Sequence, residues 1–168
     1  AAVVLTAGAA LITEIALTRI FSVVFYYHSA FLAVSIAMFG LSAGGVLSYA
    51  FAARGAELYR RLGRLSLMNA AALVAALAVA VHAGAWPARF WPLAAVYFAA
   101  AAPFVCTGVI LSLVVAETIS RVDRIYFFDL LGAATGCLMV IPFLNVMGGP
   151  GAILGAAVLL AAAAGVWF

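Results

Sequence analysis

The sequence predicts an all-α protein, a polytopic transmembrane helix bundle of about six spans with both termini in the cytoplasm. Of its 168 residues, 70% are hydrophobic and 8% are charged, and the mean hydropathy is +1.31. A span needs about 20 apolar residues, so the chain has room for several. A β-barrel would alternate in polarity along short segments, whereas runs such as AALVAALAVAV do not alternate.

The first two spans are expected at residues 2–25 and 30–53. As one helix, residues 2–53 would be about 78 Å long, far more than a bilayer is thick, so the chain must reverse once. Tyr26, Tyr27 and His28 are the best place for the reversal, because amphipathic aromatic residues collect at membrane interfaces.

The remaining spans follow from the polar breaks. An arginine-rich loop covers residues 54–64, aromatic and turn-forming residues lie at 84–91, a charged loop covers 117–124 and a Gly/Pro turn covers 145–151. Pro103 is expected to kink the fourth span. The predicted spans between these breaks are 65–83, 92–116, 125–144 and 152–168, all in one transmembrane domain, residues 1–168.

Arginine placement sets the predicted orientation. The basic excess, which gives a pI near 9.2, is entirely arginine. Arginine-rich short loops stay in the cytoplasm, so we predict a bacterial inner-membrane protein whose partners are the bilayer and its anionic headgroups, with no nucleic acid. The arginines of the two predicted cytoplasmic loops are Arg54, Arg60, Arg61, Arg64, Arg121 and Arg124, against Arg89 on the other side.

Glu14, Arg19 and Asp129, here called the charged trio, lie within predicted spans. A charge at bilayer depth is costly, so it usually has a partner or a function. Helix rise places Glu14 near mid-membrane and Asp129 within about one helical turn of that depth. The trio is therefore the first candidate site: a buried pair that docks helices, a proton or substrate path, or a contact to a partner domain.

Small residues spaced four apart let helix backbones approach closely. The pairs are Gly40 and Gly44, Gly132 and Gly136, and Gly151 and Gly155. They predict helix packing within the chain, with a homo-oligomer or other membrane subunits as the alternative.

Catalytic, cofactor and metal motifs are not found. The chain has no G-x-S-x-G, H-E-x-x-H, Walker loop or C-x-x-C. His28 and His82 have no carboxylate or cysteine nearby in sequence and are a weak metal signal. Cys106 and Cys137 lie within apolar spans, where cysteine behaves as a small hydrophobe. We assign no catalytic residue, metal or cofactor.

Three stretches carry a family resemblance: LITEIALTRIFS followed by FYYHSAF, then MFGLSAGGVLS, and finally RIYFFDLLGAATGCLMVIPFLNVMGGPGAIL. Together they resemble the membrane domain of bacterial spermidine synthase-like membrane proteins, in which several spans precede a cytoplasmic aminopropyltransferase-like domain. The resemblance implies that any aminopropyl transfer resides beyond Phe168. The positions that match its motifs are Glu14, Arg19, Tyr126, Asp129, Gly132 and Gly136.

These observations lead to one main hypothesis and two alternatives. The main one is a membrane anchor or assembly subunit, attached to a cytoplasmic spermidine synthase-like domain in a longer polypeptide. The first alternative is a small transporter or ion-coupled carrier, with polyamines as candidate substrates, that uses its buried acidic residues. The second is an accessory subunit of a respiratory or photosynthetic complex.

Overall fold

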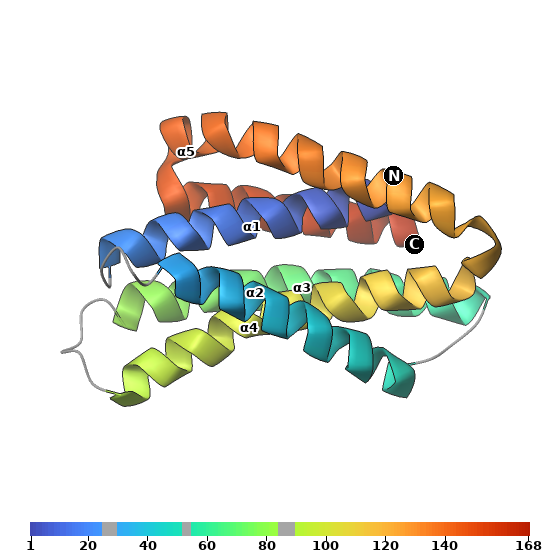
Figure 1. Ribbon diagram of the computed structural model, residues 1–168, viewed down its shortest axis with the longest axis horizontal. Helices are drawn as coiled ribbons and strands as arrows, with labels where there is room; N and C mark the ends of the chain where they lie inside the picture. The colour runs from blue at the N-terminus through green and yellow to red at the C-terminus, as the bar shows by residue number, and fades with distance from the viewer. Residues whose placement is uncertain (25–29, 52–54, 84–89) are drawn as a thin grey trace.

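The computed structural model describes residues 1–24, 30–51, 55–83 and 90–168, and these residues form an all-helical bundle (Figure 1). Five of its helices are long and apolar enough to cross a membrane. The predicted reversal at Tyr26 to His28, and Arg54 and Arg89, lie outside the described residues. The helices are α1 (Ala2–Val24), α2 (Ala30–Leu47), α3 (Ala56–Ala83), α4 (Phe90–Glu117) and α5 (Val122–Trp167), with short 3-10 helices η2 (Ser48–Phe51) after α2 and η3 (Ile119–Arg121) before α5.

Helix α3 begins earlier than predicted. Residues 56–64 were expected to be a loop, but they form the first turns of α3. Glu57 and Arg61 are spaced one turn apart and form an ion pair of 2.6 Å there, a pairing that supports a helix. The arginines of this segment therefore extend a spanning helix beyond its apolar part.

Helix α5 differs most from a simple span. It contains 46 residues, which would extend about 69 Å if the helix were straight. Gly148 has a non-helical backbone, with φ of 69° and ψ of −177°, and joins two helical arms there. The arms fold back along each other in Figure 1, and Gly155 of the second arm faces the ring of Phe143 in the first. The Gly/Pro turn predicted at 145–151 is thus reduced to this one residue.

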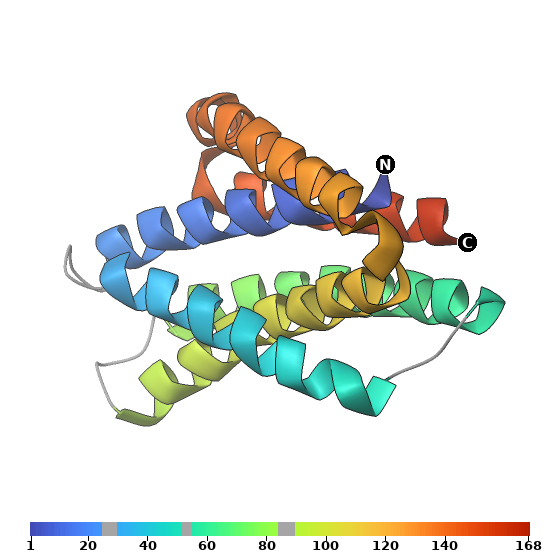
Figure 2. The same cartoon turned by 45° about the vertical axis from the view of Figure 1, so that its right-hand side comes forward.

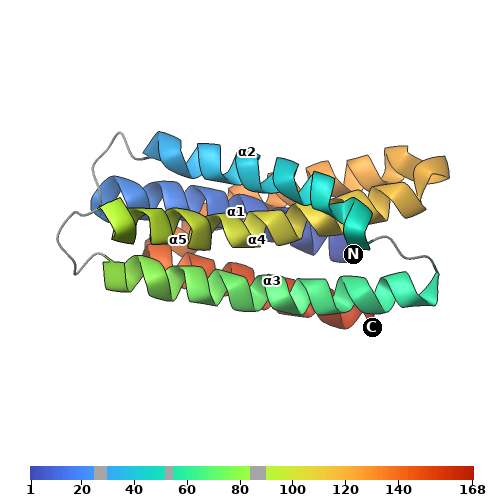
Figure 3. The ribbon, with the colours of Figure 1, turned by 90° about the horizontal axis from the view of Figure 1, so that it is seen from below.

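The second arm of α5 belongs to the interior of the bundle, whereas the first arm lies outside it. Small buried residues of the second arm, such as Ala152, Ala156 and Ala163, face the core. The first arm buries only Gly132, Gly136 and Val140 and lies over α1 (Figures 1 and 2). Seen from below, α4 lies between α2 and α3 (Figure 3).

Both termini lie at the end of the bundle where α3 begins and α4 passes into α5 (Figure 1). We call this the basic end, because the described loop arginines, Arg60, Arg61, Arg64, Arg121 and Arg124, lie on these elements. Val3 near the N-terminus shares a core cluster with Leu58 of α3, and Phe168 lies against Gly63. Two turns of the chain also meet here, since the Gly55 N–H donates to Glu117 Oε1 at 3.3 Å.

Candidate functional site

Glu14 lies at the middle of α1 and is half-buried. Its carboxylate has no hydrogen-bond or ion-pair partner among the residues that the structure describes. Its helix neighbours Thr13 and Leu17 are buried. Glu14 is thus an ionisable group at the middle of a membrane-capable helix that no described side chain neutralises.

Asp129 is far from Glu14. The first arm of α5 runs parallel to α1, because Gly132 packs on Val4 and Gly136 packs on Gly8. Facing residue numbers differ by 128 in both contacts, so Asp129 is level with Ala1, the residue before α1 and 13 residues before Glu14. That spacing is about 20 Å, not the single turn that the sequence suggested.

Arg19 lies near the opposite end of the bundle. In the same register it is level with Met147, beside the junction at Gly148, and its neighbour Ile20 contacts Gly149. Its side chain is exposed, and long arginine side chains near a helix end can extend to the membrane surface. The structure therefore spreads the charged trio along the bundle instead of gathering it into one site.

The predicted glycines lie at close approaches of backbone. A Cβ atom added at Gly136 would lie 2.6 Å from the Gly8 carbonyl oxygen, and one added at Gly40 would lie 2.6 Å from Phe104 Cβ. At Gly44 it would lie 2.9 Å from both Gly108 Cα and Val109 N. Real Cβ atoms do not come this close. The packing of α2 on α4, and of α1 on α5, therefore requires glycine at these positions.

The last glycine pair packs inside α5 itself. Gly151 lies against Met147 across the junction, and Gly155 lies 3.4 Å from the Phe143 ring, both measured from an added Cβ atom. Gly151 thus allows the arms of α5 to fold together, whereas a methyl group at Gly155 would make an ordinary contact.

Sequence reasoning missed a buried polar group between α3 and α4. Asn69 Nδ2 donates to Thr107 Oγ1 at 2.9 Å, and the two residues are 1% and 3% exposed. Ser66, one turn before Asn69, is also buried, and its hydroxyl and Asn69 Oδ1 have no described partner. Asn69, the only asparagine within the third predicted span, was the available signal.

No group of three or more His, Cys, Asp or Glu residues comes together among the described residues. His82 is exposed and bonds the Ala78 carbonyl oxygen at 2.8 Å, whereas His28 lies outside the described residues. Cys106 and Cys137 are free thiols.

Comparison with models of protein families, with curated proteins and with solved structures gave no significant match. The resemblance to spermidine synthase-like membrane proteins therefore rests on the quoted residues.

Proposed function

We propose that this chain is a bacterial inner-membrane domain that acts as an anchor or assembly subunit for a cytoplasmic spermidine synthase-like domain carried by the same polypeptide. One observation carries the proposal: both termini and the described loop arginines share the basic end. Because arginine-rich short loops remain in the cytoplasm, this end faces the cytoplasm and a domain joined to the C-terminus would lie there too. The arms of α5 then cross separately, giving six crossings.

Orientation is tested by the accessibility of single cysteines. Cys106 and Cys137 are first replaced by alanine, and Arg60→Cys and His82→Cys are then made at exposed positions on opposite ends of α3. A membrane-impermeant maleimide should label Arg60→Cys only in inverted vesicles and His82→Cys only in intact spheroplasts. The reverse pattern would overturn the orientation.

The count of crossings and the attachment need two further measurements. Asn145→Cys, exposed near the α5 junction, should be labelled from the same side as His82→Cys if both arms cross. An intact mass of the native protein well above 17.3 kDa would support a fused cytoplasmic domain, and a mass near that value would remove it.

Glu14 favours a second function, that of a carrier. An unpaired carboxyl group at mid-depth is the kind of group that transporters use to bind cations. In reconstituted vesicles, Glu14→Gln should then abolish uptake of labelled spermidine while the matched change Glu117→Gln at the basic end leaves it intact. The carrier would be rejected if the unmodified protein took up no spermidine and Glu14→Gln accumulated and folded like the unmodified protein.

A further inference from the structure

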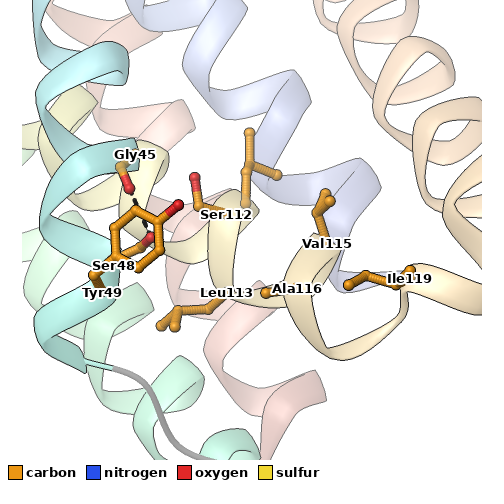
Figure 4. A pocket seen from close by; sticks show the side chains of 9 residues that line it. Gly45, Ser48, Tyr49, Ser112, Leu113, Val115, Ala116 and Ile119 are labelled. Atoms are coloured by element: carbon orange, nitrogen blue, oxygen red, sulfur yellow. Dashed lines mark hydrogen bonds between the residues drawn. The ribbon is translucent and has the colours of Figure 1, made fainter.

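A hollow opens on the side of the bundle between the end of α2 and the end of α4. Its volume is about 450 Å³, within the range of pockets that hold small ligands. Tyr49 and Ser48 of η2 form one wall, and the last turns of α4 and Ile119 of η3 form the other (Figure 4). The walls are mostly apolar, so the hollow suits a hydrocarbon chain.

Ser112 gives the hollow a polar group without a protein partner. Two serine hydroxyls of α2 bond the carbonyl of the preceding turn: Ser35 bonds Phe31, and Ser42 bonds Met38. Ser112 makes no such bond among the described residues, and its oxygen lies 3.5 Å from the position of a Cβ atom added at Gly45. Its hydroxyl is thus free to donate to an oxygen of a ligand seated in the hollow.

The rim of the hollow is charged. Ile119 and Arg121 belong to the same three-residue helix, so their Cα atoms are at most about 7 Å apart. Arg121 is exposed. The nearby carboxylate of Glu117 accepts the Gly55 N–H, so it is directed toward the start of α3. The long side chain of Arg121 therefore has the reach to place its guanidinium group, which pairs well with phosphate, at the rim.

The hollow, Ser112 and Arg121 follow one another along the axis of α4 in the order of the parts of a phospholipid. Ser112 lies five residues before the end of α4, about 8 Å deeper along the helix axis than Glu117. An apolar chain in the hollow, an ester carbonyl at Ser112 and a phosphate at Arg121 would follow one another from the bilayer interior toward its surface.

We propose that the hollow binds one anionic phospholipid of the cytoplasmic leaflet, with an acyl chain between η2 and α4 and its phosphate on Arg121. This proposal rests on membrane residence with the basic end inward, but not on the attached enzyme domain. It differs from a general attraction of lipid to arginines, because it assigns the acyl chain to this one hollow and the phosphate to Arg121.

Photo-crosslinking tests the site in the protein as it exists, reconstituted in phosphatidylcholine vesicles. The probe is phosphatidylglycerol with a diazirine in one acyl chain, compared with the same group on phosphatidylcholine. The label from phosphatidylglycerol should map to peptides of η2 and the end of α4. Arg121→Gln should reduce it about fivefold, the weight of one arginine near an anionic surface. Arg60→Gln, at the same end but on α3, should change it little.

Variants that fill the hollow provide a second test. Gly45→Leu should remove the label at η2 and α4, and Gly165→Leu should not, because a side chain at Gly165 enters open space. Ser112→Leu is a second filling variant. It should also remove the label, provided that its helical circular dichroism matches that of the unmodified protein. Equal labelling by both lipids, equal effects of the two arginine variants, or labelling that persists in the folded filling variants would overturn the proposal.

Discussion

The adjacent glycines Gly44 and Gly45 offer a controlled measurement of how α2 packs on α4. A methyl group added at Gly44 would lie 2.9 Å from the Gly108 Cα atom and closer still to the Val105 carbonyl oxygen. These are backbone atoms, so α2 must move away as a whole. One added at Gly45 meets only Ser112 Oγ at 3.5 Å, an ordinary contact.

The magnitude follows from the difference between the two variants. Gly→Ala in a helix gains up to about 1 kcal/mol of helix propensity at either position, and that gain cancels in the comparison. Overpacking costs about 1 to 3 kcal/mol. We therefore expect Gly44→Ala to be about 1 to 3 kcal/mol less stable than Gly45→Ala.

Unfolding by sodium dodecyl sulfate in mixed micelles, followed by circular dichroism, measures this difference. Both variants should remain helical, with the transition of Gly44→Ala at a lower mole fraction of the denaturing detergent. Equal transitions would mean that α2 and α4 do not approach at Gly44, and the described interface would be refuted.

Three further changes test other features by the same unfolding measurement. Gly148→Ala should cost about 1 to 3 kcal/mol, because φ of 69° with ψ of −177° is a backbone region almost restricted to glycine; no loss would mean that the α5 junction has another conformation. A double-mutant cycle of Asn69→Leu and Thr107→Val should give a coupling of about 0.6 and at most about 1.7 kcal/mol, and zero coupling would contradict the buried hydrogen bond. Arg61→Gln removes an exposed ion pair and should change stability by less than about 0.5 kcal/mol, so a larger, salt-insensitive loss would show that Arg61 has another role.

Composition and hydropathy were enough to predict an all-helical protein with several membrane-capable helices. The low hydropathy of the arginine-rich segment before residue 65 predicts a loop, whereas residues 56–64 are helical. A helix can nevertheless continue past the apolar core of a bilayer, and the Glu57 and Arg61 spacing favours that continuation. Hydropathy therefore located the third span but not the start of its helix.

The relative depth of residues on different helices could not be obtained in this way. The sequence estimate measured Glu14 and Asp129 from the two predicted interfaces separately. The actual register is fixed by the contacts of Gly132 with Val4 and of Gly136 with Gly8, which join segments more than 120 residues apart in sequence. Small-residue spacing shows that such contacts are available, but it does not show which helix supplies the partner.

This register also determines how Glu14 and Asp129 should respond to substitution. If the charged trio acted as a unit, Glu14→Gln and Asp129→Asn would be strongly coupled, because each would alter the surroundings of the other. With about 20 Å between them along the helices, the two changes in unfolding free energy should instead add to within about 0.5 kcal/mol. Coupling well above that value would require the carboxylates to approach each other in another conformation, as a carrier that alternates between two states would allow. Additive changes would mean that Glu14 acts independently of Asp129. Glu14 would then be the one member of the charged trio that does not lie near an end of the bundle.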